Sequence, residues 1–574
     1  MQKTCKKCSQ NFEITDDDLK FYEKVSPIFE GKKYLIPAPK LCPECRLQRK
    51  LIFRNERTLY KRKCDLSGKE IVSVYNPEIK IKVFDNDTWY SDKWSALDYS
   101  MEIDLSKSFF EQFKILYQKV PRISLMNQAS ENSEYANYAY RNKNCYMIFG
   151  SHYNEDSFYG SYNWKTKNCL DCLEVLESEL IYEGNYCSEC YDSRYIQYCF
   201  NSNNCYFCYD LIGCKNCIFS SNLRNKEYYI FNKKSSKEEY LNFFHKINFG
   251  SYTETKNNLS KFQELIKNSI HRAYFQKNCE NSFGDDMQNS KNLYYSFSTK
   301  NAEDCRYIYG SGTNMKDCID CAYIGYDLCE SICECIGNSG NTSCMCLNAC
   351  WHNHNIYYCE QCFGCNDCFG CIGLKNKKYC ILNKQYTKEE YSNFVSKIIN
   401  SMIQDELWGL FFDPLISLLG YNETIAQDYF PLTKFAVRNA DLHSLQRFNW
   451  SDYEPEFPHV EKIIPANLLP DSISDIPDDI LNWAILPVDM PCQGISTNRP
   501  FKIIKPELEF YRKMNLPIPH LHPDERHKKR MGLRNPRKLW KRNCMKCNDE
   551  IQTTYSPDRS EIVYCEKCFL KSVY

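Results

Sequence analysis

Cysteine pairs separated by two residues are the feature of this sequence with the clearest chemistry. The pairs near the two ends of the chain are Cys5/Cys8, Cys42/Cys45, Cys544/Cys547 and Cys565/Cys568. A C-x2-C pair forms a tight knuckle that directs two thiolates at one point, so two such pairs suit one tetrahedral zinc ion. The interval between Cys547 and Cys565 lies within the about 15–20 residues typical of such sites. We therefore predict a zinc site at each end.

The two ends of the chain repeat one another, because residues 521–568 align without a gap with residues 41–88. In the amino-terminal copy, the positions of the second cysteine set hold Cys64, Ser67, Asp85 and Thr88. In the carboxyl-terminal copy, the counterparts of the first set are Cys492, His522 and Glu525. Losing even one thiolate weakens a structural zinc site severely, because metal binding contributes to folding. The repeat thus predicts about two Zn²⁺ per chain rather than four.

Both copies keep a basic segment beside the zinc ligands. Residues 46–63 hold eight Lys/Arg and one Glu, in a protein whose formal net charge is zero. Steps of three and four residues place these charges on one face of a predicted helix. A solvated helix face is one interpretation and a polyanion-binding face is the other. The candidate nucleic-acid-binding residues are Arg46, Arg49, Lys50, Arg54, Arg57, Tyr60, Lys61, Arg526, Lys529, Arg530, Arg534, Arg537, Trp540 and Lys541, with Tyr60 and Trp540 available to stack on bases.

The middle of the chain consists of short units rich in Cys, Tyr and Asn. Every 24th residue from Cys145 is small, giving Cys169, Ser193 and Cys217. A fixed period of this size is typical of a solenoid, in which stacked coils bury a continuous core. Short strands and polar turns favour a parallel β-helix, and Asn before the repeated Cys, as at Asn144, suits a turn.

This middle region is a tandem duplication whose two units, 136–270 and 271–400, end in similar sequences. Ser236-Lys-Glu-Glu239 and Thr387-Lys-Glu-Glu390 are capping boxes, so we expect each unit to close with an amphipathic helix. The second unit is less regular in its spacing than the first.

The cysteines of the middle region have two interpretations, metal ligation and packing. The run Cys359, Cys362, Cys365, Cys368 and Cys371 has ligand spacing, but it continues without the terminal C-x3-C-P of bacterial iron–sulfur motifs, which disfavours a cluster. Cys is small and commonly buried, and Ser193 replaces it without a change of rhythm. We therefore favour a Cys-lined core, with scattered zinc knuckles as the alternative.

The predicted fold is multidomain and β-rich, with two terminal zinc-ribbon or treble-clef-like α+β modules flanking a tandem Cys-rich parallel β-helix. Its segments are an amino-terminal zinc module with a basic helix (1–63), a hairpin and helix connector (64–135), two solenoid units (136–270 and 271–400), a helical element with a Pro-containing linker (401–490), and a carboxyl-terminal zinc module with a basic helix (491–574).

Composition places limits on the environment and on partners. The chain has 574 residues, 36 of them Cys, and its start lacks the apolar core of a secretory signal. Disulfides belong to exported proteins, so these Cys are expected to be reduced or metal-bound in the cytoplasm. The longest apolar run, 407–421, is shorter than the roughly 20 residues of a membrane span, so no membrane partner is expected.

No catalytic signature is present: the sequence contains no HExxH, P-loop, GxSxG or dinucleotide fingerprint. Four thiolates at each predicted zinc leave no open position for substrate. We expect a non-enzymatic protein that binds nucleic acid or a ribonucleoprotein. The alternative is a scaffold that meets a protein partner, or a second copy of itself, through the solenoid surface.

The chain resembles a group of Cys-rich proteins of candidate-phyla bacteria with reduced genomes. The resemblance is carried by the motifs LCPECR from residue 41, RNER from residue 54, the KEEY-containing unit ends, and HPDERHKKR with LRNP near the carboxyl end. It covers nearly the full length. It implies zinc-ribbon-like ends and a Cys-rich middle, and no activity is assigned to the group.

Overall fold

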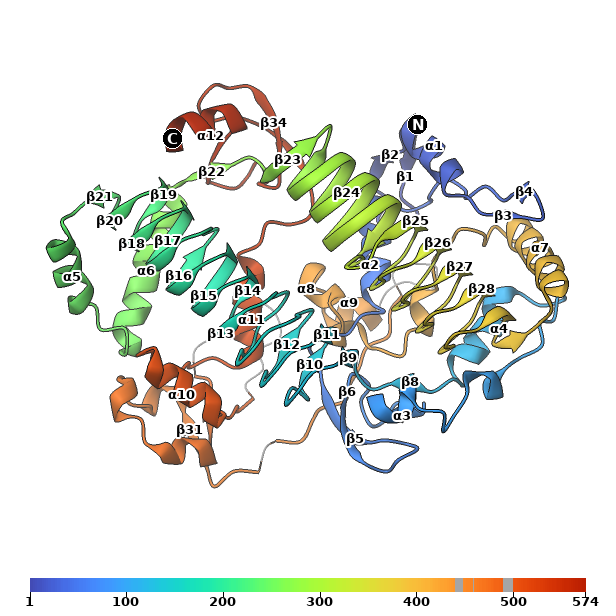
Figure 1. The fold of residues 1–574 in the computed structure, drawn as a ribbon, viewed down its shortest axis with the longest axis horizontal. Helices are drawn as coiled ribbons and strands as arrows, with labels where there is room; N and C mark the ends of the chain where they lie inside the picture. The colour runs from blue at the N-terminus through green and yellow to red at the C-terminus, as the bar shows by residue number, and fades with distance from the viewer. Residues whose placement is uncertain (439–446, 458, 489–498) are drawn as a thin grey trace. The chain divides into compact units, whose positions relative to one another are not determined.

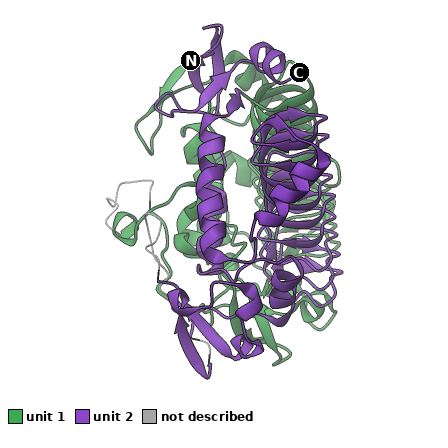
Figure 2. Ribbon diagram, turned by 90° about the vertical axis from the view of Figure 1, so that its left-hand side faces the viewer, with its two compact units in different colours: residues 1–125, 274–453, 537–539 green, residues 126–273, 454–536, 540–574 purple. Residues whose placement is uncertain are grey.

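The computed structural model describes residues 1–438, 447–457, 459–488 and 499–574. Two long series of parallel strands dominate it, and shorter helices and hairpins surround them (Figure 1). The chain divides into two compact units (Figure 2). Unit 1 comprises residues 1–125, 274–453 and 537–539, and unit 2 comprises residues 126–273, 454–536 and 540–574. Each unit therefore combines one end of the chain with one series of parallel strands.

The first series, called ladder 1, belongs to unit 2 and covers residues 127–234. Its parallel strands are β9 (Asn127–Gln128), β10 (Ala136–Asn137), β11 (Ala139–Tyr140), β12 (Ile148–Phe149), β13 (Lys167–Leu170), β14 (Leu173–Leu176), β15 (Glu179–Ser188), β16 (Tyr191–Gln197), β17 (Asn203–Ile212), β18 (Lys215–Ile218), β19 (Ser221–Arg224) and β20 (Glu227–Ile230), closed by antiparallel β21 (Lys233–Lys234). Paired residues lie 12 positions apart, as in Cys169 with Ile181 and Cys205 with Cys217. The predicted period of 24 is thus wrong by a factor of two.

Ladder 1 is built from triplets, because every third residue has a positive φ. Asn168 (φ 51), Asp171 (φ 56) and Glu174 (φ 54) are successive examples. Asn and Asp tolerate this left-handed region better than most residues. Over positive-φ positions 141–219 the next residue is buried in every case. Hydrophobic residues at these buried positions form one core cluster: Cys169, Cys172, Val175, Ile181, Cys187, Cys190, Ile196, Cys199, Cys205, Cys208, Leu211, Cys214 and Cys217. C-x2-C spacing here follows from the triplet, and the cluster confirms a Cys-lined core.

Ser and Cys occupy the same buried positions and bond the backbone in the same way. The Ser193 hydroxyl donates to the Tyr191 carbonyl at 3.0 Å and accepts from the Cys205 N–H, 12 residues later, at 3.1 Å. The Cys205 thiol likewise donates to the Asn203 carbonyl at 3.4 Å. Ser at position 193 in place of Cys is therefore compatible with a packed core, because a Ser hydroxyl and a Cys thiol can each bond a neighbouring backbone group.

The second series, ladder 2, belongs to unit 1. Its strands are β23 (Gln276–Glu280), β24 (Phe283–Ala322), β25 (Cys329–Cys333), β26 (Thr342–Met345), β27 (His354–Tyr357), β28 (Asn366–Phe369) and β29 (Lys378–Ile381), closed by antiparallel β30 (Lys384–Gln385). Gln276 pairs with Met287 and Met315 with Cys329, steps of 11 and 14 residues. From Glu330, which pairs with Thr342, the step is 12. The lower regularity expected of this unit is confirmed.

Each ladder ends at a helix, as predicted. In unit 2, α5 (Lys237–Lys246) packs against β20 and α6 (Tyr252–Asn268) against β17, and in unit 1, α7 (Lys388–Gln404) packs against β29. The hydroxyls of Ser236 and Thr387 accept from the third helical N–H, and Glu239 and Glu390 accept from the N-cap N–H in return. Both predicted capping boxes are present.

The terminal regions supply the remaining elements. Unit 1 contains β1 (Gln2–Thr4), β2 (Asn11–Glu13), α1 (Asp16–Lys24), β3 (Ile28–Phe29), β4 (Lys32–Lys33), α2 (Pro43–Leu51), β5 (Tyr60–Lys63), β6 (Glu70–Ser73), β7 (Val83–Phe84), α3 (Asn86–Tyr90), α4 (Phe109–Tyr117), β8 (Arg122–Ile123), α8 (Ala426–Tyr429) and α9 (Lys434–Arg438). Unit 2 contains β22 (Ile270–Arg272), β31 (Lys462–Pro465), β32 (Trp483–Leu486), α10 (Lys505–Lys513), α11 (Pro523–Gly532), β33 (Trp540–Asn543), β34 (Glu550–Thr553), β35 (Ile562–Tyr564) and α12 (Glu566–Val573).

The predicted basic helices are shorter than expected. In unit 1 the helix ends at Leu51, and the Asn55 side chain then accepts from the Thr58 N–H at 3.0 Å to form a turn. In unit 2 the helix ends at Gly532, shortly before Pro536, which disfavours helical backbone at the residue before it. Tyr60 and Trp540 consequently begin strands. Among the described residues, no helix is long and apolar enough to cross a membrane.

Candidate metal centres and the basic segments beside them

The first candidate metal centre joins a hairpin to a helix in unit 1. Strands β1 and β2 carry the Cys5/Cys8 knuckle, closed by a bond from the Ser9 N–H to the Cys5 carbonyl at 3.0 Å. Cys42 is the N-cap of α2, and Cys45 lies in its first turn. All four Sγ atoms lie within 4.8 Å of one another, and the Cys8 and Cys42 sulfurs are 3.7 Å apart. A tetrahedral ion with Zn–S about 2.3 Å places sulfurs ~3.8 Å apart.

Local hydrogen bonds favour the thiolate at Cys42, whereas the hydrogen bond with Cys42 and burial raise the pKa of Cys45. The Cys42 N–H donates to Cys5 Sγ at 3.3 Å. Hydrogen bonds from the Cys45 side chain and backbone lower the pKa of Cys42 to about 5, and a helix N-terminus also favours negative charge. Cys5, Cys42 and Cys45 are buried. The centre can therefore hold a metal away from solvent.

The second centre repeats this plan in unit 2. The hairpin of β33 and β34 carries Cys544 and Cys547, Cys565 is the N-cap of α12, and Cys568 follows in its first turn. The four sulfurs again lie within 4.8 Å of one another. Burial opposes ionisation, but hydrogen bonds from the backbone of Cys547, Cys565 and Lys546 lower the pKa of Cys544 to about 6. Unlike the first centre, this one has an exposed ligand, Cys547.

Hydrogen bonds link the residues of the incomplete copy of the second centre, which lies in unit 1. Cys64 lies between β5 and β6, and Asp85 is the N-cap of α3. The Asp85 carboxylate accepts from the hydroxyls of Ser67 (2.8 Å) and Thr88 (2.7 Å), and Cys64 Sγ accepts from the Asp85 N–H at 3.4 Å. These bonds hold the same knuckle and helix start together without four thiolates.

The degenerate copy of the first centre, in unit 2, has changed in the same manner. His522 is the N-cap of α11, and its Nδ1 accepts from the Asp524 N–H at 3.2 Å. Glu525 pairs with Lys528 at 2.8 Å. Cys492 lies outside the described residues. Among the residues that are described, the two complete Cys₄ sets are the groups that could hold a metal ion.

The donor sets define the chemistry of both centres. Four thiolates with tetrahedral spacing match zinc, which they saturate, so the ion would have no site for water or substrate. A metal of this kind stabilises the fold that brings its ligands together. By this geometry, both centres could hold a metal ion.

The basic segment of unit 1 is buried against ladder 2. The Arg46 guanidinium lies 2.8 Å from Asp320 Oδ1, and Tyr22 donates a hydrogen bond to the same carboxylate. The Lys50 ammonium lies 2.8 Å from Glu334 Oε2. Arg49 lies 3.0 Å from the other Glu334 oxygen, and Arg54 pairs with Glu56 at 2.6 Å.

These contacts control the charge of Glu334. Although burial opposes ionisation, Lys50 and Arg49 hold the pKa of Glu334 below its usual range. The side chain of Lys50 is fully buried and that of Arg46 is 3% exposed. Neither side chain is available to a phosphate.

Unit 2 builds an equivalent contact with ladder 1. Arg526 pairs with Asp171, and Arg530 lies 2.8 Å from the second oxygen of Asp171. Arg530 also lies 3.4 Å from Glu183, and Arg534 lies 3.8 Å from Glu174. In the alignment of the two ends, Arg526 and Arg530 correspond to Arg46 and Lys50. The chain therefore makes the same helix-to-ladder contact twice.

The predicted nucleic-acid-binding residues differ widely in their exposure. The side chains of Arg46, Arg49, Lys50, Arg54, Arg526, Arg530 and Arg534 form ion pairs within their own unit and are at most 12% exposed. Tyr60 is buried and donates to Glu423 at 2.6 Å, while Arg57, Arg537 and Trp540 are partly buried. Lys61, Lys529 and Lys541 are exposed. Exposure of the segment was overestimated, because its partners are distant in sequence.

The acidic partners were missed in the sequence, although they share a signal. Asp171, Glu174, Glu183, Asp320 and Glu334 all occupy positive-φ positions of triplets. Each of these acids directly precedes a buried residue of the ladder core. Acidic residues at the triplet positions beside a Cys-rich core could have identified the surface that receives the basic helices.

Comparison with known proteins adds no family. No protein-family model matches the chain, and no curated protein matches it significantly. Among solved structures, one from Desulfovibrio desulfuricans G20 that is assigned as an acetyltransferase aligns with 9% identity and a TM-score of 0.10. The alignment covers 42% of this chain and 66% of that one, which is less than two thirds of its length. A likeness at this level carries no argument about fold or activity.

Proposed function

We propose that this chain is a non-catalytic zinc-binding scaffold. In each unit a zinc-stabilised terminal module packs its basic helix onto a ladder, and the remaining ladder faces are available to a partner. We infer further that each ladder is the wall of a solenoid whose turn is about 12 residues, since neighbouring strands differ by this step. The abundance of free thiols suits a reducing compartment such as the cytoplasm.

One observation carries the proposal: the basic helices are used inside the protein. Arg46 and Lys50 in unit 1, and Arg526 and Arg530 in unit 2, meet buried carboxylates of a ladder. Desolvated charges are tolerated where such partners compensate them. The duplicated contact supports an internal, architectural role for the segment that both ends of the chain share.

Nucleic-acid binding is the competing prediction, and of its candidate residues Lys61, Lys529 and Lys541 are exposed. Affinity for a polyanion grows with the number of phosphates neutralised. Three lysines distributed over two units can neutralise few phosphates and so provide little affinity for a polyanion. The scaffold function is therefore favoured.

Two measurements on the zinc-loaded full chain separate these functions. Size-exclusion chromatography with light scattering on a nuclease-treated sample should give a defined assembly, or a copurifying protein, without nucleic acid. Filter binding over a salt series should show no retention of RNA or DNA at physiological salt. Salt-dependent retention that is lost in a K61E/K529E/K541E variant would instead support the nucleic-acid function and overturn the scaffold.

A further inference from the structure

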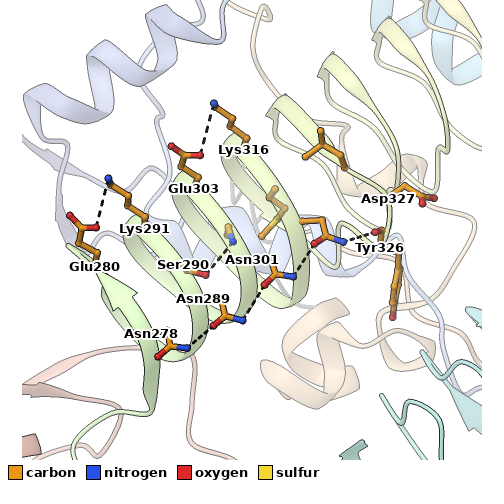
Figure 3. Close-up of a pocket in the computed structure, with 14 residues that line it drawn as sticks. Asn278, Glu280, Asn289, Ser290, Lys291, Asn301, Glu303, Lys316, Tyr326 and Asp327 are labelled. Atoms are coloured by element: carbon orange, nitrogen blue, oxygen red, sulfur yellow. Dashed lines mark hydrogen bonds and ion pairs between the residues drawn. The ribbon is translucent and has the colours of Figure 1, made fainter. Parts of the chain in front are cut away.

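The first turns of ladder 2 carry a groove lined mainly by polar residues (Figure 3). Its volume is about 820 Å³, and all of its lining residues belong to unit 1. Such a volume lies within the about 300–1,000 Å³ of small-molecule sites. The groove therefore has the size of a binding site.

One side of the groove is a continuous row of asparagines. Asn278 donates to Asn289 at 3.0 Å, Asn289 to Asn301 at 3.4 Å, and Asn301 to Asn314 at 3.1 Å, and Asn314 donates to the Tyr326 carbonyl at 2.7 Å (Figure 3). Each carboxamide has two N–H donors and an oxygen with two lone pairs. These bonds use one donor of each Asn and one lone pair of each accepting Asn. The row can thus offer further donors and acceptors at every rung.

A second row of alternating charge runs beside the first. Glu280 lies 3.7 Å from Lys291, and Glu303 lies 3.9 Å from Lys316 (Figure 3). Each charge is two residues after an Asn of the first row, so the triplet pattern repeats along the groove. Because every Lys has a Glu neighbour, the row presents hydrogen-bonding groups with no net charge. A polyanion or a polycation gains little from such a surface.

From these rows we propose that the groove binds a neutral, hydroxyl-rich linear chain, that is, an extended oligosaccharide. Adjacent strands repeat every ~4.8 Å, which is close to the length of one sugar unit in an extended glycan. Vicinal hydroxyls can both donate and accept, so each sugar can bond one Asn and one charged side chain of a rung. The ring of Tyr326, 41% exposed at the end of the row, can pack on the apolar face of a sugar.

This ligand proposal rests on the proposed scaffold function. It adds to that function by naming the molecule that binds one face of ladder 2. Four steps of ~4.8 Å from Asn278 to Tyr326 give a length of ~19 Å. This length accommodates about four sugar units. Tetrasaccharides are therefore the appropriate probes.

The test is calorimetric titration of the zinc-loaded full chain with cellotetraose and with chitotetraose. The variant is Asn289→Gly with Asn301→Gly, because Gly keeps the positive φ (47 and 52) and removes both carboxamides. The matched control is Asn132→Gly with Asn144→Gly in ladder 1, a pair with similar φ and the same hydrogen bond at 3.1 Å. We expect saturable binding of at least one tetrasaccharide, at least tenfold weaker in the variant and unchanged in the control.

Three results would overturn the proposal. They are the absence of binding up to millimolar concentration, equal affinity in the variant and the wild-type chain, and salt-sensitive binding of oligo-dT or polygalacturonate at the same Asn residues. The thermal midpoints of variant and control are compared in the same samples. Zinc-dependent stability with no sugar binding would refute the ligand and leave the scaffold function standing, so the two failures can be distinguished.

Discussion

Replacing Asp171 by Asn tests the contact between the basic helix and the ladder in unit 2. Asp171 is fully buried and pairs with both Arg526 and Arg530. Asn has nearly the same shape and accepts the positive φ of 56 at this position. The substitution therefore removes one negative charge while the packing is retained.

The expected loss is large because two buried guanidinium groups lose their shared partner. Breaking a buried pair costs about 3–5 kcal/mol. Arg526 keeps Glu507 at 3.4 Å and Arg530 keeps Glu183 at 3.4 Å, which places the loss at the lower end, ~3 kcal/mol. In a unit of this size, that corresponds to a fall in melting temperature of ~6–12 °C.

The assay is thermal and urea unfolding of the zinc-loaded chain, followed by circular dichroism. Asp156→Asn is the matched control, because Asp156 has a φ of 47 and bonds Asn144 at 3.0 Å without meeting an arginine in the described contacts. The control should change stability by less than about 0.5 kcal/mol. If Asp171→Asn matched the control, the claim that ladder carboxylates hold the basic helix would be refuted.

Three further predictions follow from the two metal centres and from buried groups. A chelator should remove zinc from the carboxyl-terminal centre first, because Cys547 is exposed and Cys5 is buried. A colorimetric zinc indicator measures the release, and loss of both ions at one rate would contradict this prediction. A thiol reagent should modify the partly exposed Cys279 and spare Cys172, whose pKa is raised well above its usual value by burial; mass spectrometry of labelled peptides reports the pattern, and rapid labelling of Cys172 would oppose it. Burial lowers the pKa of His271 to about 4, so the folded state favours the neutral ring, and its contribution is lost as pH falls from 6.5 towards 4. The free energy of unfolding, measured by urea titration, should be about 1 kcal/mol lower at pH 5.5 than at pH 7.5. The His271→Gln variant should show a smaller difference between the two pH values.

The two Cys₄ centres were predictable from the sequence because the spacing within each cysteine pair is local. A C-x2-C knuckle fixes the positions of two sulfurs, and the internal repeat showed which sets were complete. The incomplete cysteine set around Cys64 was also visible in the sequence, because Ser67, Asp85 and Thr88 stand where the other copy has three cysteines. The structure adds that hydrogen bonds among these side chains maintain the knuckle.

The ladder period was misjudged because the core accepts several residue types. Along one column of ladder 1, Cys145, Ser157, Cys169, Ile181 and Ser193 succeed one another at steps of 12. Cys145 and Cys169 are identical and lie two steps apart, with Ser157 between them, so a search by identity finds a spacing of 24. The physical requirement is a small or apolar side chain after each positive-φ residue, which several residue types satisfy.

The role of the basic segments could not be predicted from periodicity. The spacing identified a charged face, but not its partner. Asp320 and Glu334 follow Arg46 and Lys50 by nearly three hundred residues. The triplet pattern can mark these acids as a class, but it does not say which basic residue each one meets. A charge run with buried partners is identical in sequence to a solvated one.

Metal content tests the central claim most directly. Elemental analysis of the reduced, purified chain should give about two zinc ions, one for each Cys₄ centre, and no iron. Replacing Cys42 and Cys565 by Ser, one at a time, should each remove one ion. Six or more zinc ions, or stoichiometric iron, would show that the ladder cysteines bind metal and would contradict the account of a packed thiol core.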